Sequence, residues 1–127
     1  MKIHESAENY LEAILMIQLE KGSVRSIDVA HQLSFSKPSV SRAVSLLREN
    51  GYILMDRDGL LELTPTGREI AETIYERHIL ISNWLVSLGI PAEIAVKDAC
   101  KMEHDVSPVT FQKLKEYIQN HNQTPEE

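Results

Sequence analysis

The sequence predicts a mainly α-helical protein with one small β-hairpin. Apolar residues recur at helical spacing over most of the 127-residue chain, and the period changes to about two only between residues 52 and 64. Glycine and proline stand where helices are expected to begin or end. Hydrophobic residues make up 43% and charged residues 25% of the chain, which is ordinary globular usage and excludes a disordered chain.

Three helices and the hairpin are expected in the N-terminal half. The first helix runs from about His4 to Lys21 with Leu11, Ile14, Leu15 and Leu19 in its apolar line, and Gly22 follows it. Ser26 is expected to cap a short second helix that ends at Leu33. The third has Pro38 in its first turn, continues from Ser39 to Asn50 and buries Val40, Val44 and Leu47. Residues 52–56 and 60–64 are expected to be strands joined by an Asp-Gly turn.

Three further helices are expected in the C-terminal half. Thr64-Pro65 begins a long helix that reaches about Leu88, with Ile74, His78, Ile81, Leu85 and Leu88 in one line. Pro91 opens the next helix, and Ser107-Pro108 opens the last. We place the domain boundary after residue 68, which gives an N-terminal domain of residues 1–68 and a C-terminal domain of residues 69–127.

The order of elements before residue 68 predicts a winged helix-turn-helix DNA-binding domain. A recognition helix needs an apolar back and a front of short side chains, so that its backbone can enter the major groove. Arg42 can reach base edges, whereas Lys37, Arg48 and Arg57 are better placed for phosphates. Each of these residues alone reads equally well as a solvated surface residue, and the sequence of three elements is what favours DNA binding. The candidate DNA-binding residues are Ser36, Lys37, Pro38, Ser39, Ser41, Arg42, Ser45, Arg48 and Arg57.

The charge distribution agrees with this placement. The net charge of -6 argues at first against a polyanionic partner. Residues 21–68, however, carry seven basic and five acidic side chains, whereas both flanking segments are acidic. Uneven surface charge without functional meaning remains the alternative.

A second group of residues predicts a metal site. Cys100, Glu103 and His104 stand at i, i+3 and i+4, which places them on one face of a helix. Thiolate, carboxylate and imidazole together suit a divalent transition metal better than calcium or magnesium. Asn9 and Glu12 have the same i, i+3 relation on the first helix, and His78 adds an imidazole.

Each candidate ligand also has an ordinary structural interpretation. His78 alone is a core histidine, Cys100 alone is a buried small hydrophobe, and Glu12 alone is a solvated charge. Cys100 and His104 can also be read as a nucleophile and base for acyl transfer, but the sequence shows no oxyanion hole or orienting third group.

Several segments together resemble the diphtheria toxin repressor and manganese transport regulator family of metal-dependent repressors. These segments are Glu8-Asn9-Tyr10-Leu11-Glu12, Ser36-Lys37-Pro38-Ser39-Val40-Ser41, Leu63-Thr64-Pro65-Thr66-Gly67, His78 and Asp98-Ala99-Cys100-Lys101-Met102-Glu103-His104. The similarity runs from about His4 to Leu114. It implies a winged helix-turn-helix domain, a helical dimerisation domain, and metal bound between the first helix and the dimerisation helices. Metal loading is then expected to favour DNA binding and to repress metal-uptake genes.

The resemblance also assigns roles to individual residues. Cys100, Glu103 and His104 match the primary ligand motif of the iron-responsive branch, Glu12 matches a ligand of the manganese branch, and His78 matches ligands of both. Asn9 departs from the Met or Asp of the two branches. Ser82 and Val96 replace the Glu and His of an ancillary iron site, which is therefore expected to be incomplete. The chain also ends before an SH3-like third domain, as in two-domain manganese regulators.

We expect Fe(II) or Mn(II) as the metal in the cell, with Zn(II), Co(II) or Ni(II) able to bind in vitro because thiolate favours later metals. This ligand set leads to a hypothesis for the metal response. Without metal, Glu12, Glu103 and Cys100 repel one another, and a bound cation sets the relative position of the two DNA-binding domains of a dimer.

We further expect a cytoplasmic homodimer that binds an inverted-repeat operator in double-stranded DNA. The C-terminal helices have more apolar surface than one small domain buries, no apolar run approaches the ~20 residues of a membrane span, and the N-terminus lacks a signal-peptide pattern. Two other classes stay open: a metal-independent winged-helix regulator of an organic ligand, and a small thiol or zinc enzyme.

Overall fold

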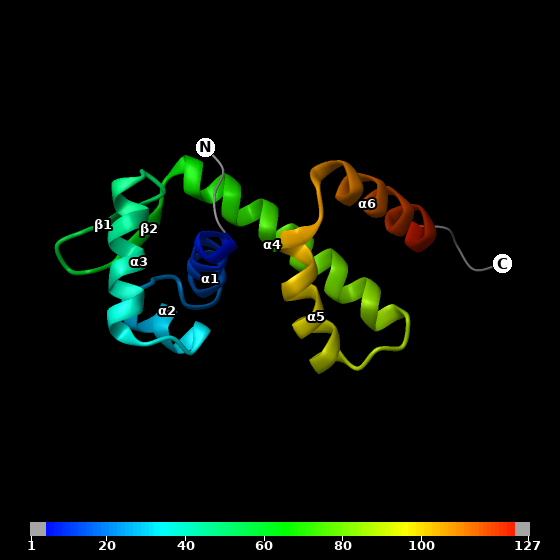
Figure 1. Ribbon diagram of the computed structural model, residues 1–127, viewed down its shortest axis with the longest axis horizontal. Helices are drawn as coiled ribbons and strands as arrows, with labels where there is room; N and C mark the ends of the chain where they lie inside the picture. Colours follow the sequence, from blue (N-terminus) through cyan, green and yellow to red (C-terminus); the bar gives the residue numbers. More distant parts are fainter. Residues whose placement is uncertain (1–4, 124–127) are drawn as a thin grey trace. The chain divides into compact units, whose positions relative to one another are not determined.

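The computed structural model describes residues 5–123, which form six helices and one two-stranded antiparallel sheet (Figure 1). The elements are α1 (Glu5–Lys21), α2 (Ser26–Leu33), α3 (Lys37–Glu49), β1 (Ile53–Met55), β2 (Leu61–Leu63), α4 (Pro65–Ser87), α5 (Ala92–Asp105) and α6 (Pro108–Gln123). The predicted fold class is confirmed. The chain divides into two compact units, of which the first ends at Thr73 and the second begins at Ile74, both within α4.

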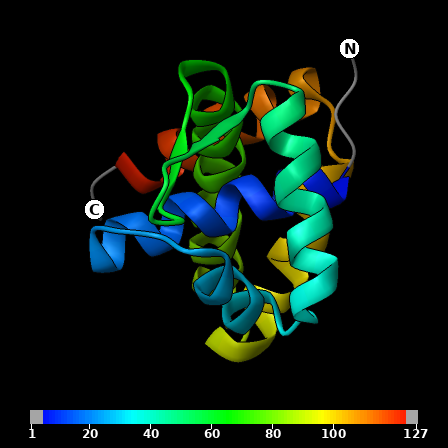
Figure 2. The same cartoon turned by 90° about the vertical axis from the view of Figure 1, so that its left-hand side faces the viewer.

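The first unit is a winged helix-turn-helix. Helices α1, α2 and α3 and the β1–β2 hairpin pack against one another (Figure 2), and their inward-facing side chains form an apolar core. In α3 the predicted stripe is buried, whereas Leu46 on the same helix is 58% exposed. The largest fully buried apolar side chains of this unit are Leu11, Ile14, Val24, Val29, Val40 and Ile53.

Helix α2 begins differently from the sequence prediction. Arg25, not Ser26, is the N-cap, and its backbone N–H donates to Asp28 Oδ2 at 2.9 Å. Arg25 is held in an extended conformation by a β-bridge to Leu60, and the chain turns helical at Ser26, one residue earlier than predicted. Lys21 Nζ donates to the other Asp28 oxygen at 2.8 Å, and this contact, with the Arg25 N–H, lowers the pKa of the Asp28 carboxyl.

The hairpin and the start of α4 are fixed to each other. In the sheet Ile53 pairs with Leu63 and Met55 pairs with Leu61. Thr64 Oγ1 donates to Gly51 O at 2.7 Å and accepts from the Gly67 N–H at 3.1 Å. A Cβ at Gly67 would lie 2.0 Å from Tyr52 O, so only glycine allows α4 to begin this close to the hairpin.

The second unit consists of α4 from Ile74 onward, α5 and α6. Its core contains Ile81, Leu85, Ala95, Ala99 and Phe111. Leu88 was predicted in the apolar line of α4, but it follows the end of the helix and is 61% exposed. Leu19, predicted in the line of α1, is 63% exposed. Both lie at helix ends, where periodicity predicts a face but not an element that covers it. No helix in the described residues is long and apolar enough to cross a membrane.

Candidate metal centre and DNA-binding surface

Helices α4 and α5 bring an imidazole, a thiol and a carboxyl together. His78 Nδ1 lies 3.0 Å from Glu103 Oε1 and 3.9 Å from Cys100 Sγ. One ligand atom from each of these three residues lies within 4.8 Å of the other two. The His104 Nε2 atom is 3.4 Å from the second oxygen of Glu103. The structure therefore places four of the six predicted metal ligands in one cluster.

Local helix geometry explains this convergence. Ala95 and Ala99, which have no exposed surface, face the core of the second unit and set the rotation of α5. Glu103 follows Ala99 by four residues and lies on the same buried face. His78 lies between the buried Ile74 and Ile81 in the apolar line of α4, which directs its imidazole inward.

Burial differs sharply among these side chains. Glu103 is fully buried, and its Oε2, although it lies 3.4 Å from His104 Nε2, makes no hydrogen bond within the residues that the structure describes. The transfer of a carboxylate from water into such a site is costly unless an opposite charge or a metal compensates it. Cys100 in contrast is exposed, so its interpretation as a buried small hydrophobe is wrong.

The donor set fits a divalent transition metal. Ligand atoms at about 2.0–2.3 Å from such an ion, separated by angles of about 90–110°, lie about 3–3.7 Å from each other. The contacts of His78 with Glu103 and Cys100, 3.0 and 3.9 Å long, are close to that range. A positive ion here would also satisfy the buried Glu103 oxygen. The mixture of nitrogen, oxygen and sulfur donors favours Fe, Co, Ni or Zn over calcium or magnesium.

The remaining predicted ligands, Asn9 and Glu12, lie one turn apart on α1 in the first unit. Glu12 is buried, so its interpretation as a solvated charge is wrong. The participation of both residues in metal binding stays a prediction.

Helix α3 presents most of the predicted DNA-binding residues to solvent. Ser41, Arg42, Ser45 and Arg48 are exposed along the helix, and Lys37 and Pro38 are exposed in its first turn. Ser36 and Ser39 also hold the start of the helix: Ser36 Oγ accepts from the Ser39 N–H at 3.3 Å and donates to Ser39 Oγ at 2.9 Å. Their use as DNA contacts, like that of the others, stays a prediction.

Arg42 also acts electrostatically on the first helix. Burial raises the pKa of the Tyr10 hydroxyl, and the positive charge of Arg42 partly opposes this shift. Tyr10 packs edge-on against Phe35, which lies in the turn between α2 and α3, with 5.8 Å between the ring centroids. The turn of the helix-turn-helix is therefore held against α1 by an aromatic pair.

The hairpin tip carries Arg57 between two aspartates. Asp56 Oδ1 accepts from the backbone N–H groups of Asp58 and Leu60, each at 2.9 Å, and Arg25 donates to the carbonyl of Asp58. Both aspartate contacts fix the turn, and Arg57 is exposed at its tip; its use as a phosphate contact stays a prediction.

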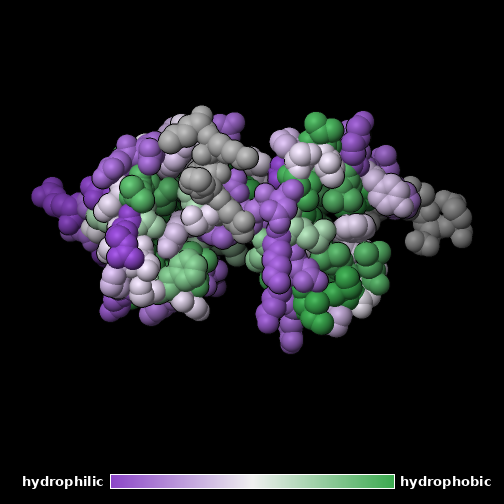
Figure 3. Space-filling model, viewed as in Figure 1, coloured by the Kyte–Doolittle hydropathy of each residue, from purple (hydrophilic) through white to green (hydrophobic). Residues whose placement is uncertain are grey.

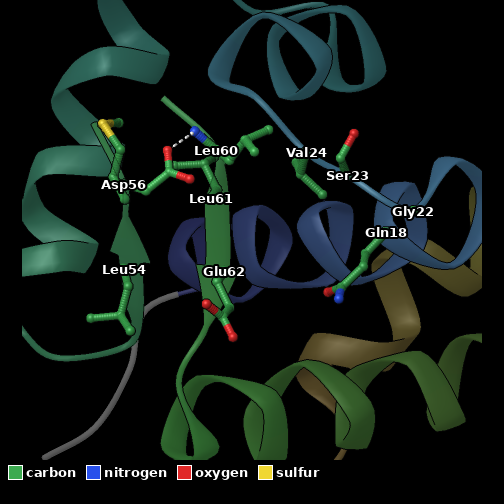
Figure 4. A pocket seen from close by; sticks show the side chains of 10 residues that line it. Gln18, Gly22, Ser23, Val24, Leu54, Asp56, Leu60, Leu61 and Glu62 are labelled. Atoms are coloured by element: carbon green, nitrogen blue, oxygen red, sulfur yellow. Dashed lines mark hydrogen bonds between the residues drawn. The ribbon is translucent and has the colours of Figure 1, made fainter. Parts of the chain in front are cut away.

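An open hollow of about 550 Å³ lies beside β2 (Figure 4). Its lining includes Gln18, Ser23, Leu54, Asp56 and Glu62, and Figure 4 shows the hydrogen bond from Leu60 N–H to Asp56. The two carboxylates would repel phosphate, which makes this face a poor DNA contact.

Comparison with known proteins gives the family. The model described as "Iron dependent repressor, N-terminal DNA binding domain" matches residues 2–68. The model described as "Iron dependent repressor, metal binding and dimerisation domain" matches residues 64–127. The chain belongs to the iron-dependent repressor family. This family consists of metal-dependent, DNA-binding transcriptional repressors, and the resemblance inferred from sequence is confirmed.

Relatives of this iron-dependent repressor chain include transcriptional regulators named MntR. The transcriptional regulator MntR of Salmonella typhimurium is 35% identical over 122 residues, which cover 96% of this chain and 78% of the relative. The HTH-type transcriptional regulator MntR of Geobacillus kaustophilus is 32% identical over 114 residues, which cover 90% of this chain and 81% of the relative.

Solved structures of the same kind are also similar. The manganese regulator SloR has a TM-score of 0.78 and 28% identity, and the match covers 94% of this chain. A manganese-dependent transcriptional repressor in complex with manganese has a TM-score of 0.79 and 26% identity, and the match covers 89% of this chain. The chain spans about half the length of these two solved chains, 55% and 52%.

Sequence reasoning missed two residues that organise these sites. Arg77, directly before His78, is buried and hydrogen-bonded to the carbonyls of Glu103 and Val106. Arg25 caps α2 and binds the hairpin turn. The only signal for Arg77 was an arginine beside a histidine in an apolar line, and spacing alone does not distinguish it from a surface arginine.

Proposed function

We propose that this chain is a transcriptional repressor that senses Fe(II) or Mn(II) and controls genes for metal uptake. The proposal is supported by one observation above all: the convergence of His78, Cys100 and Glu103, with a buried carboxylate oxygen that lacks a hydrogen-bond partner among the described residues. Three different donors in one cluster, one of them a fully buried acidic side chain, support the proposal of a bound cation.

The metal identity within this proposal follows from the ligands and the relatives. The thiol of Cys100 favours Fe(II) and later metals. The two solved structures named above are of a manganese regulator and a manganese-dependent repressor. Fe(II) and Mn(II) are therefore both retained for the cell, whereas Zn(II), Co(II) and Ni(II) are expected to bind in vitro.

We assign His78, Cys100, Glu103 and His104 as ligands, joined by Asn9 and Glu12 of α1. A bound divalent cation would supply positive charge and a fixed coordination geometry. His78 would then hold α4, and Cys100 and Glu103 would hold α5, at a defined separation, while Glu12 would lose its repulsion from Glu103. The DNA-competent conformation gains stability only by the difference in metal affinity between the two conformations.

A homodimer and an inverted-repeat operator complete the proposal. The second unit exposes large apolar side chains on α4, α5 and the segment between them, and Figure 3 shows hydrophobic residues gathered around that connection. They include Val86, Leu88, Ile94 and Val96. Such surface on a domain of the dimerisation type is suited to a second copy, and two-fold symmetry requires a two-fold symmetric DNA site.

Two ligand variants test the proposed function. Glu103→Ala and His104→Ala should abolish the metal-dependent part of DNA binding and leave folded dimers, as measured by mobility shift, circular dichroism and analytical ultracentrifugation. Lys101→Ala, an exposed change on α5, is the matched control and should retain the metal response. DNA affinity that responds neither to a chelator nor to these substitutions would refute the proposal.

A further inference from the structure

Arg77 connects the metal centre to its surrounding helices. It belongs to α4, directly before His78, and its side chain is buried. Nη1 donates to Glu103 O at 2.9 Å and to Val106 O at 2.7 Å. The guanidinium lies over the Phe111 ring of α6, 5.0 Å from its centroid. One side chain therefore contacts the last turn of α5, the residue that ends it, and α6.

The partners of Arg77 are unusual for a buried charge. The cost of burying an arginine side chain is normally offset by a carboxylate. Within residues 5–123 no carboxylate pairs with Arg77; its contacts are two backbone carbonyls and an aromatic face. Carbonyls at a helix C-terminus carry partial negative charge, which suits a cation. The same two bonds fix the backbone at Glu103.

The position of that backbone determines where the ligands lie. Glu103 O and Glu103 Oε1 belong to the same residue, and the latter is 3.0 Å from His78 Nδ1. Arg77 and His78 are consecutive in α4, so one turn of this helix binds both the backbone and the carboxylate of Glu103. We propose that Arg77 is a positioning residue of the metal centre, which holds the C-terminal turn of α5 so that Glu103 meets His78. This inference rests on the proposed metal-binding function.

If Arg77 positions Glu103, its substitution should lower the metal affinity of a protein that still folds. Loss of the two bonds should let the end of α5 relax, so that part of the metal-binding free energy is spent on restoring the ligand position. Changes to groups that orient metal ligands commonly weaken binding 10- to 100-fold. We expect Arg77→Met to weaken Co(II) binding by about 10-fold or more. Arg77→Lys, which keeps the charge but cannot form the same fork, should fall between Arg77→Met and wild type.

Lys115→Met is the matched control. Lys115 of α6 pairs with Glu76, the residue before Arg77 in α4. Like Arg77, it links α4 to α6, but this pair does not involve Glu103. Co(II) is titrated against each full-length protein in competition with a chelator, below the temperature at which circular dichroism first detects unfolding. The Co(II) ligand-field spectrum is recorded at saturation as a readout of coordination geometry.

Comparison of the Arg77 variants with Lys115→Met shows whether Arg77 positions the metal ligands. Weaker binding and an altered spectrum for Arg77→Met and Arg77→Lys, with wild-type values for Lys115→Met, support the inference. Wild-type affinity and spectrum in the Arg77 variants overturn it, as does an equal loss in Lys115→Met, which would indicate general loosening of the helices. Should Arg77→Met not fold, Arg77→Lys decides by the same criteria. A wild-type protein that binds no Co(II) would instead contradict the proposed function.

Discussion

The Cys100→Ser substitution isolates the contribution of the thiol to metal binding. Cys100 is the one cysteine of the chain and its side chain is exposed. Exposed substitutions usually change the free energy of unfolding by less than about 0.5 kcal/mol. The chelator-treated variant should therefore melt within about 2 °C of the wild type. Serine is nearly isosteric with cysteine but offers a neutral hydroxyl in place of a thiolate, so the metal-bound state should lose a ligand.

The size of the effect follows from linkage. A metal at 100 times its Kd stabilises the folded state by about 2.7 kcal/mol. Unfolding entropy of about 2.1 cal/mol/K per residue, applied to 127 residues, converts this into a rise in Tm of about 10 °C. Changes to groups that only orient metal ligands weaken binding by up to about 100-fold. Loss of a ligand itself, the thiolate, should therefore weaken Co(II) binding at least about 100-fold. The same Co(II) concentration would then raise the Tm by only about 1.5 °C.

Thermal melts with and without Co(II) measure this difference, and the thiolate-to-Co(II) charge-transfer band measures the bond directly. Lys101→Ala is the control, since Lys101 is the exposed neighbour of Cys100 on α5. If Cys100→Ser retains both the wild-type Tm rise and the charge-transfer band, the sulfur is not a ligand and the assignment of the site is wrong.

Three further predictions concern the DNA-binding unit. Arg42→Ala should reduce the preference for the operator over random DNA by about 1–3 kcal/mol, whereas an equal loss on all sequences in competition binding would argue against base reading. Gly67→Ala should destabilise the chain by more than about 3 kcal/mol in urea unfolding, because its Cβ would lie 2.0 Å from Tyr52 O; wild-type stability would contradict the packing described. Asp28→Ala should cost about 1 kcal/mol at pH 7, because the hydrogen bonds that Asp28 accepts from the Arg25 N–H and from Lys21 at the start of α2 are lost. The pKa of Asp28 is lowered in the folded state, so the carboxylate stabilises the fold above its ordinary pKa and loses this effect as pH falls through the lowered value. The difference in unfolding free energy between the wild type and Asp28→Ala should therefore shrink in acid. A difference that persists in acid would contradict this reasoning.

Sequence periodicity predicted the fold because most elements bury one face and end at recognisable residues. Pro38 lies in the first turn of α3, and Pro65 follows Thr64 at the start of α4, as predicted. The cap and the first residue of α2 were predicted one position too late. The actual cap, Arg25, is held by its bridge to Leu60, which is a long-range contact. Local sequence carries no information on such a contact.

The metal cluster was predictable to the extent that helix spacing determines it. The i, i+3, i+4 relation places Cys100, Glu103 and His104 on one face. That His78 meets Glu103 depends on the packing of α4 against α5, for which its place in an apolar line was only a hint. The burial of Glu103 and the contacts of Arg77 required the structure, since an acidic residue and an arginine on helices are most often solvated.

The most direct test of the account is a DNA-binding titration of the wild-type protein against Mn(II), Fe(II) and Zn(II), with a chelator control, on operator DNA selected from a random pool in the presence of metal. If metal loading controls DNA binding, at least one of these metals should raise affinity for an inverted-repeat sequence, and the chelator should reverse the gain. Equal affinity with metal and with chelator would contradict metal-dependent repression and leave a winged-helix protein that does not respond to metal.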